Sequence, residues 1–571
     1  MPDFDALDPL FDAFPPTSTE AWETAIRSDL HGTSYEDLLV WDTGEGFTLQ
    51  PYYRAEDLDD LTHVDLHAET PPLAASGTHP ANTWRIRQDL PDAPDTAAEQ
   101  AADALERGTT DLGVSCAPDA LSAALADVPL DATPLHLHGP DAATLFAALL
   151  DLADARDVNP EDLSGTVGFD PLAALATGQV ADPDAAFATA ADLAVDAPSA
   201  FRTLAIDAQP YHDAGATLAD ELAFTLGALS ESLAQLTERG VPLAQAVKSV
   251  HVVVPMSTSY FLEIAKLRAL RLLATDVIEA FADAADVSLD IEPTDLFLQA
   301  RTSRRTQTLY GPYVNMLRGT TEAMAAAIGG CDVLQVDPFD RLDAAPSVRG
   351  TRIARNTSLI LQEEAHLDRV ADPAAGSYYI EAATDAVASA VWERFQALEA
   401  GRGLLVALQD GRVQARIAST RADREDAIAH RDRVLVGTNH YPDLDERRAD
   451  VLDEPVDEPT PETAIEPLPS IRLAEPFEAM RAATERYADA HDGPPTVALL
   501  PMGHRNWRSA RATFARNFFG VAGFAIDEPI GFDTAADAIQ HAADIDADLL
   551  VLCSSDREYP KRTRNVRDAM D

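Results

Sequence analysis

Short runs of apolar and β-branched residues alternate with longer amphipathic stretches between residues 111 and 372. The longer stretches place apolar residues at helical spacing, as in 218–240 and 260–284. The short runs read as strands, and they lie at 111–116, 134–139, 165–170, 203–208, 249–255, 296–301, 332–338 and 368–372. Strands that alternate with helices form parallel sheets, and eight of them favour a (β/α)8 TIM barrel over a doubly wound open sheet.

The hydrophobic pattern changes on both sides of this region. Residues 1–100 are mixed and predict an N-terminal arm that packs on a barrel domain at 101–447, whose last part, 381–435, is helical. Residues 448–470 are rich in Pro, Glu and Asp. Because this composition cannot bury a core, it predicts a linker to a second α/β unit at 471–571.

The second unit has its own alternation of strands and helices. Strands are expected at 495–501, 521–527 and 547–555, with a helix after each. This order is typical of flavodoxin-like domains, which have five strands. We therefore expect a domain that is either shortened or incomplete.

Composition excludes several classes of protein. The chain has 571 residues, which is too long for one ordinary domain. No apolar run is long enough for a transmembrane helix, and the acidic N-terminus does not resemble a secretory signal. Three widely spaced cysteines predict neither a disulfide framework nor a zinc site, so the expected location is cytoplasmic.

The charge is strongly acidic, with 96 Asp and Glu residues against 43 Lys and Arg and a formal net charge of −53. The acidic residues are spread along the whole chain. This distribution favours a halophilic protein, whose surface charges are screened by multimolar salt, over an acidic surface built for a cationic partner. Nucleic-acid binding is disfavoured, because phosphate contacts need clustered Lys and Arg.

The segment 352–381, RIARNTSLILQEEAHLDRVADPAAGSYYIE, is the most distinctive part of the chain. It predicts a helix, a Pro/Gly turn and then an aromatic strand from Ser377. This order resembles the signature of the acyl-CoA mutases that use adenosylcobalamin, methylmalonyl-CoA mutase above all. The resemblance implies a barrel, a cobalamin-binding-like C-terminal domain and a radical isomerisation of an acyl-CoA.

The first functional motif of that family is Ile-Arg-Gln-Tyr-Ala-Gly, whose Tyr wedges against the substrate. Here Ile86, Arg87 and Gln88 match, but Asp89 stands in place of the Tyr. A carboxylate cannot replace a phenol, and an unpaired one is costly to desolvate beside a radical. We therefore expect Asp89 to be a solvated surface residue in a chain without an active site there.

The second motif is a Tyr-His pair at the end of the fourth barrel strand, whose His donates a hydrogen bond to the migrating carbonyl. Aligned without gaps, Gln209 and Pro210 stand at these positions, and Tyr211-His212 follows two residues later. A two-residue shift moves a side chain by several ångströms. His212 is thus expected to be a loop or helix-start residue, although it is the best fallback candidate for catalysis.

The third motif is Asp-x-His-x-x-Gly, whose His ligates cobalt and whose Asp orients that His. Met502-Gly503 match the preceding residues of the family. Arg505, Trp507 and Ala510 then stand at the three motif positions. Since Trp cannot ligate cobalt, the resemblance implies that adenosylcobalamin is bound by a partner and not by this chain.

These departures resemble the small subunit of the heterodimeric bacterial methylmalonyl-CoA mutase. The resemblance implies a chain without catalytic or metal-binding residues that supports a large subunit, where (R)-methylmalonyl-CoA becomes succinyl-CoA. One alternative is an active mutase for another branched acyl-CoA, with His212 as donor and cobalamin on a separate chain. Another is a non-enzymatic assembly module. His136 and His138 share one face of a strand, but no third metal ligand is evident.

Overall fold

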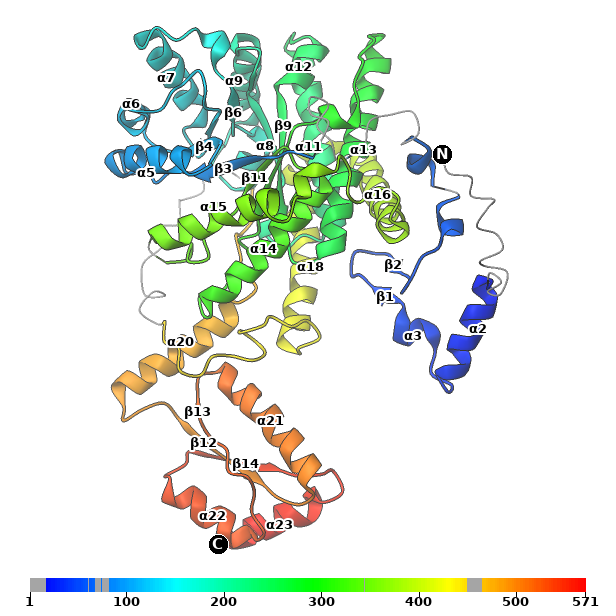
Figure 1. Ribbon diagram of the computed structural model, residues 1–571, viewed down its shortest axis with the longest axis vertical. Helices are drawn as coiled ribbons and strands as arrows, with labels where there is room; N and C mark the ends of the chain where they lie inside the picture. Colours follow the sequence, from blue (N-terminus) through cyan, green and yellow to red (C-terminus); the bar gives the residue numbers. More distant parts are fainter. Residues whose placement is uncertain are drawn as a thin grey trace.

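The structure is a computed structural model that describes residues 17–59, 61–66, 73, 82–343, 345–448 and 465–570. Most of the predicted linker, 449–464, lies outside the described residues. Figure 1 shows three parts: a large barrel, an arm beside it and a small C-terminal sheet below it.

The described strands of the large part form one parallel sheet in the order β7-β6-β5-β4-β3-β11-β10-β9-β8. Only Thr203 separates β7 from β8, so a single interrupted strand pairs with β6 through its first half and with β9 through its second. The sheet is therefore a closed barrel of eight strand positions, as predicted. Its segments are β3 (Arg85–Asp89), β4 (Asp111–Val114), β5 (Leu135–Leu137), β6 (Gly165–Val167), β7 (Phe201–Arg202), β8 (Leu204–Asp207), β9 (Val250–Met256), β10 (Leu298–Thr302) and β11 (Val333–Gln335).

The prediction of a strand at 368–372 is wrong. Leu367–Arg369 form a short 3-10 helix, and the aromatic run after it begins helix α16 (Tyr378–Ala400) instead of a strand. Its place in the barrel is taken by β3, which lies inside the segment 1–100 that the sequence assigns to the arm. In β3, Ile86 and Gln88 are buried, while Arg85, Arg87 and Asp89 are polar and less buried, so the strand has no apolar run.

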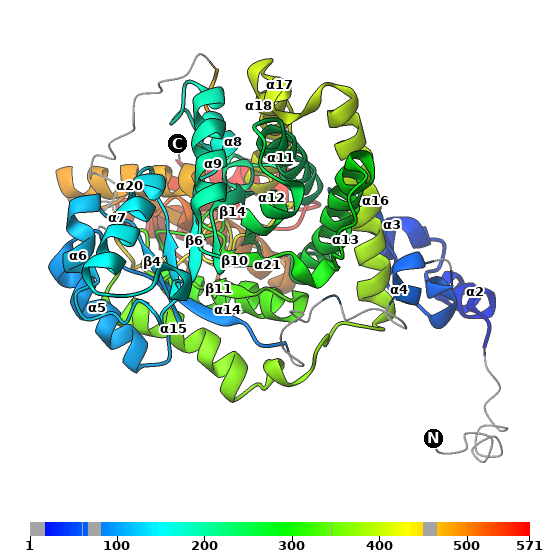
Figure 2. The same ribbon diagram turned by 90° about the horizontal axis from the view of Figure 1, so that it is seen from above.

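Helices between the strands cover the outside of the barrel, as Figure 2 shows from above. They include α5 (Pro94–Glu106), α7 (Ala142–Ala155), α9 (Pro183–Asp196), α11 (Leu218–Glu238), α13 (Tyr260–Ala285), α14 (Pro312–Gly329) and α15 (Val348–Glu363). Helix α11 begins where the Thr217 side chain accepts a hydrogen bond from the Asp220 amide. Helices α11, α13 and α16 pack together and bury long apolar faces. Within the described residues, no helix is both long and apolar enough to cross a bilayer.

A buried arginine joins these helices to the distinctive segment. Arg268 on α13 is fully buried and donates to both carboxylate oxygens of Asp372, at 2.7 and 2.6 Å, and to both of Glu381, at 2.9 Å. His63 of the arm lies 2.9 Å from the same Glu381. Burial alone raises a carboxyl pKa, but His63 and Arg268 outweigh it and lower the pKa of Glu381 to about 2.

The arm contains helices α2 (Thr19–Asp29) and α3 (Tyr35–Leu39) and a hairpin of β1 (Trp41–Asp42) and β2 (Thr48–Leu49). It projects from the side of the barrel near α16 (Figure 2). Its base is fixed by Glu45, whose buried carboxylate accepts a hydrogen bond from the Ala219 amide at 3.1 Å.

The C-terminal part begins with α20 (Glu475–Ala490), which is bound to the barrel through Glu478 and the Leu309 amide at 2.6 Å. Its strands are β12 (Thr496–Pro501), β13 (Ala525–Asp527) and β14 (Leu549–Cys553), in the parallel order β13-β12-β14. This order agrees with the flavodoxin-like prediction. Its helices are α21 (Arg505–Val521), α22 (Ala535–Asp544) and α23 (Tyr559–Met570).

We predict that Arg268→Met lowers the free energy of unfolding by about 3–5 kcal/mol, because it leaves two buried carboxylates without their cation. The matched control is Arg352→Met on the exposed face of α15, which we expect to change it by less than about 0.5 kcal/mol. Urea unfolding followed by circular dichroism measures both. Equal effects of the two substitutions would contradict a stabilising role for the buried pair.

Candidate functional site

The barrel interior is crossed by one chain of hydrogen bonds. Arg87 Nη1 on β3 donates to Gln299 Oε1 on β10 at 2.9 Å, and Gln299 Nε2 donates to Thr166 Oγ1 on β6 at 2.9 Å. Thr166 Oγ1 lies 2.9 Å from His136 Nδ1, and His136 Nε2 lies 2.7 Å from Asp111 Oδ2. Both ring nitrogens of His136 are thus engaged with protein atoms, which leaves neither for a metal ion.

Asp89 is part of this interior, so the prediction that it is a solvated surface residue is wrong. Its Oδ1 accepts from Arg87 Nε at 2.8 Å and its Oδ2 from Gln335 Nε2 at 2.7 Å. Burial alone would raise the carboxyl pKa, but Arg87 and His138 outweigh it and hold the pKa of Asp89 far below its usual value. A Cβ at Gly113 on β4 would lie 1.8 Å from Asp89 Oδ1, so only glycine leaves room for this carboxylate.

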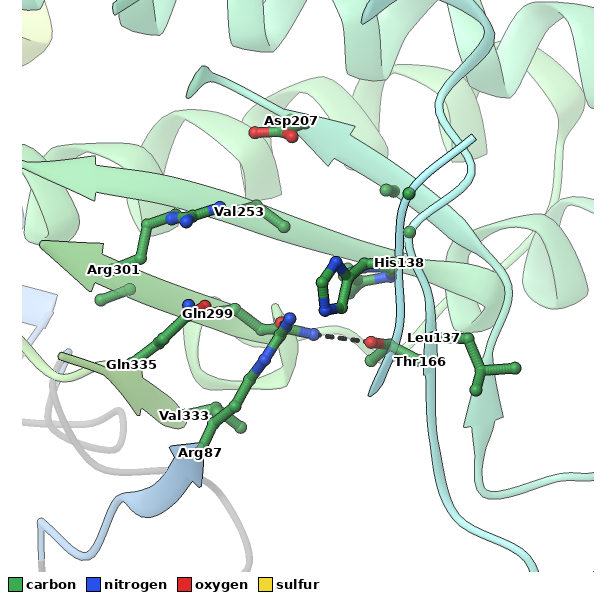
Figure 3. A pocket seen from close by; sticks show the side chains of 15 residues that line it. Arg87, Leu137, His138, Thr166, Asp207, Val253, Gln299, Arg301, Val333 and Gln335 are labelled. Carbon is green, nitrogen blue, oxygen red and sulfur yellow. Dashed lines mark hydrogen bonds between the residues drawn. The ribbon is translucent and has the colours of Figure 1, made fainter. Parts of the chain in front are cut away.

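A cavity of about 170 Å³ lies inside the barrel beside this chain of hydrogen bonds. Figure 3 shows the side chains around it: Arg87 from β3, Gln299 and Arg301 from β10, and His138, which follows β5. Its polar lining consists of Arg87, His138, Thr166, Asp207, His251, Gln299, Arg301 and Gln335. The sequence analysis singled out neither His251 nor Arg301. The sequence does contain a signal for residues of this kind. Polar residues two positions apart in a predicted strand share one face of it, as Gln299 and Arg301 do on β10.

His212 does not line this cavity. It lies in a short helix, α10 (Gln209–Asp213), which directly follows β8, and its side chain is fully buried. Its Nδ1 is 2.7 Å from Glu221 Oε2, and its Nε2 is 2.7 Å from Ser303 Oγ. Burial, together with the cations of Arg305 and Lys266, holds the pKa of His212 well below its usual value. Both nitrogens of the fallback catalytic residue are therefore engaged with protein atoms.

The positions that precede His212 belong to the same short helix. Pro210 lies in its first turn, and Gln209 Nε2 donates to Asp213 Oδ2 at 3.1 Å. The structure thus keeps Gln209 at the mouth of the barrel, paired with a neighbouring carboxylate.

The cluster around His212 contains further buried charges. Lys266 lies between Glu221 Oε1 at 2.8 Å and Glu263 Oε2 at 2.9 Å. Burial lowers the pKa of a lysine, but these carboxylates outweigh it and hold the pKa of Lys266 above its usual value. Glu322 on α14 accepts from the Ser303 amide at 3.1 Å and from Thr306 Oγ1 at 2.7 Å. Burial raises the pKa of Glu322 to about 8.

The turn between β12 and α21 carries the altered third motif. Trp507 lies on α21 with 54% of its surface exposed, and Arg505 begins the same helix. The Glu558 carboxylate covers the turn: it accepts from the His504 amide at 3.3 Å, and a Cβ at Gly503 would lie 2.4 Å from it. Among the described residues, no three His, Cys, Asp or Glu side chains form a metal-binding group.

Comparison with known proteins gives the family. The family described as methylmalonyl-CoA mutase matches residues 93–514. The chain belongs to this family. The "Methylmalonyl-CoA mutase small subunit" of Porphyromonas gingivalis is 35% identical over 96% of this chain and 90% of its own length. The proteins of the same name from Streptomyces virginiae and Propionibacterium freudenreichii subsp. shermanii are 34% and 29% identical, each over 98% of this chain and over 91% and 88% of their own lengths.

Methylmalonyl-CoA mutases use adenosylcobalamin, and in the family motif the cobalt ligand follows the turn at Gly503. An indole N–H only donates hydrogen bonds, so Trp507 has no lone pair for a metal ion. The Arg505 guanidinium cannot act as the carboxylate that orients a ligand. The side chains at the motif positions therefore do not fit cobalt ligation.

We predict that Glu322→Gln gains stability relative to the wild type as the pH rises from 5 to 8. The unfolded glutamate loses its proton near 4.5, while the folded one keeps it until about pH 8. The folded state then binds more protons in this window, so wild-type stability falls by up to about 1.4 kcal/mol per pH unit. Urea unfolding at pH 5, 6.5 and 8 measures this.

The control for this measurement is Glu363→Gln, which removes a carboxylate from the exposed surface of α15. Its difference from the wild type should change little over the same pH range. A constant difference between Glu322→Gln and the wild type would mean that Glu322 is ionised in the folded state at pH 5.

Proposed function

We propose that this chain is the small, non-catalytic subunit of a heterodimeric methylmalonyl-CoA mutase. The isomerisation of (R)-methylmalonyl-CoA to succinyl-CoA would then take place on a large subunit. The observation that carries the proposal is the filled barrel interior, where hydrogen bonds run from Arg87 to Asp111 and leave a cavity of about 170 Å³. A cavity of about 150 Å³ accommodates one benzene molecule. A coenzyme A thioester is many times larger.

The mouth of the barrel supports the same conclusion. Asp89, at the position where the family motif has Tyr, is held by Arg87 and Gln335. His212 is enclosed by Glu221 and Ser303, so it has no free nitrogen for a substrate carbonyl. In this proposal the chain keeps the fold of a mutase, while the residues at and beside two of the family's substrate-contacting positions, Asp89 and His212, are engaged with protein atoms.

The cofactor would be bound by the large subunit. Adenosylcobalamin supplies the radical that starts the isomerisation. Since Arg505 and Trp507 do not fit cobalt ligation, this chain would contribute by binding the folded large subunit. A partner that binds only the folded state stabilises it by mass action.

The arm offers a surface for that partner. No residue of helix α2 is fully buried, and Leu38 and Trp41 are 58% and 45% exposed. The arm projects beyond the outline of the barrel (Figure 2). Exposed aromatic residues of this kind are enriched at the centres of protein interfaces.

The first test uses co-expression with a longer mutase chain from the same organism that keeps intact Arg-Gln-Tyr and Asp-x-His-x-x-Gly motifs. We expect the two chains to elute together in size exclusion, with turnover by the complex and none by this chain alone. Adenosylcobalamin added to this chain alone should keep its free absorption spectrum. Turnover or a changed cobalamin spectrum with this chain alone would favour the active-mutase alternative. A fully active partner that elutes without this chain would exclude the subunit role.

The second test concerns the arm. Trp41→Ser should weaken the heterodimer roughly tenfold, because truncation of an aromatic residue at an interface typically costs more than about 1 kcal/mol. The control is Val195→Ser on α9, where the side chain is 56% exposed on the barrel surface. Surface plasmon resonance measures the dissociation constant of each variant for the large subunit. An unchanged dissociation constant for Trp41→Ser would exclude the arm from the interface.

A further inference from the structure

The cavity inside the barrel contains donor groups that the protein does not satisfy. The Arg301 guanidinium on β10 lines the cavity, and its buried Nε has no hydrogen-bond partner in the described part of the chain. The nearest carboxylate is that of Asp337, whose Oδ2 lies 3.9 Å from Arg301 Nη2. A guanidinium has five N–H donors. Buried donors without acceptors are rare in proteins, and they point to a bound group that supplies the acceptors.

His251 on β9 is a second polar side chain with an unsatisfied hydrogen-bonding atom. Its side chain is 1% exposed and lines the same cavity, and its Nδ1 has no hydrogen-bond partner among the described residues. The neighbouring His138 is similar, since its Nε2 lies 3.6 Å from Asp89 without a hydrogen bond. The three side chains come from β10, from β9 and from the residue that follows β5, and they line one space.

The charges around Arg301 do not remove the need for an acceptor. Burial lowers an arginine pKa, but the carboxylates of Asp337, Asp89 and Asp207 outweigh it and keep the pKa of Arg301 above its usual value. Arg301 is therefore a cation, and its charge is balanced by carboxylates that do not form hydrogen bonds with it. Asp89 is already bonded to Arg87 and Gln335, and Asp207 Oδ1 accepts the Gln209 amide at 2.9 Å.

The apolar part of the cavity lining limits the shape of a ligand that could bind there. Between the polar groups the cavity is lined by small apolar side chains, namely Leu137, Ala205, Val253, Ala300 and Val333. Its volume of about 170 Å³ is close to the 150 Å³ that holds one benzene, a molecule of about six non-hydrogen atoms. The occupant therefore combines an acceptor-rich end with a short apolar part.

We propose that this cavity binds a small carboxylate of about five to eight non-hydrogen atoms, whose carboxylate accepts hydrogen bonds from Arg301 and whose apolar part lies against Val253. Arginine favours carboxylates because two parallel N–H groups match the two oxygens. A single chloride ion would leave most of the space to water. The site does not depend on the proposed subunit role, because binding is measured on this chain alone.

The first experiment is isothermal titration calorimetry on the purified full chain with propionate and succinate as probes. The carboxylate replaces chloride at constant ionic strength, and propionamide serves as a control of similar shape without the charge. We expect saturable binding of at least one carboxylate and an increase in the unfolding temperature with its concentration. Failure of both carboxylates to bind would overturn the proposal, and so would equal binding of propionamide. Failure to bind would mean that ordered water or chloride fills the cavity, and equal binding of propionamide would mean that the charge of Arg301 does not select the ligand.

Variants locate the binding site. Arg301→Gln should weaken binding of the carboxylate at least tenfold. Arg341→Gln is the matched control, because Arg341 lies 3.6 Å from the same Asp337 but does not line the cavity, and its affinity should stay within twofold. Val253→Phe fills the cavity without changing charge and should abolish binding, which keeps the test decisive if Arg301→Gln does not fold. Wild-type affinity in a folded Arg301→Gln or Val253→Phe variant would overturn the assignment.

Discussion

A charge buried inside a protein has to be paired and hydrogen-bonded, because an unpaired ion in the interior costs several kcal/mol. This constraint shapes the chain at several points. Arg268 joins α13 to the segment around Asp372 and to α16, and Glu381 of α16 in turn meets His63 of the arm. Lys266 joins α11 and α13 through Glu221 and Glu263. Apart from Lys266–Glu263, which lies within α13, each pair connects separate elements, so these pairs fix how the barrel, its helices and the arm are arranged.

The same constraint explains the barrel interior. Most (β/α)8 barrels fill their interior with branched apolar residues, which need no partners. Here Arg87, Asp89, His136 and Gln299 lie inside, and their hydrogen bonds cross the space between opposite strands. A barrel interior that is filled by such a polar network has no room for a large substrate. A member of the mutase family with this interior is therefore suited to the subunit role proposed above, in which the fold serves assembly.

Arg301 and His251 depart from the pairing rule at one place, beside the remaining cavity. Glu322 avoids an unpaired buried charge in another way. Burial keeps its carboxyl group protonated to about pH 8, so it needs no cation as a partner. A buried group can thus be paired, neutral or completed by a ligand, and the proposed carboxylate site is the third of these.

The sequence by itself determined the alternation of strands and helices, the order of the C-terminal strands and the residues at the altered motif positions. These depend on local periodicity and on residue identity. The strand at Arg85–Asp89 escaped prediction because its inward face is polar, and the aromatic run from Ser377 forms a helix although its residues favour strands. Only the tertiary structure decided that Asp89 meets Arg87 and Gln335, that Glu221 and Ser303 enclose His212, and that Arg301 remains without an acceptor. Each of these depends on side chains from distant segments meeting inside a closed barrel, which no local pattern encodes.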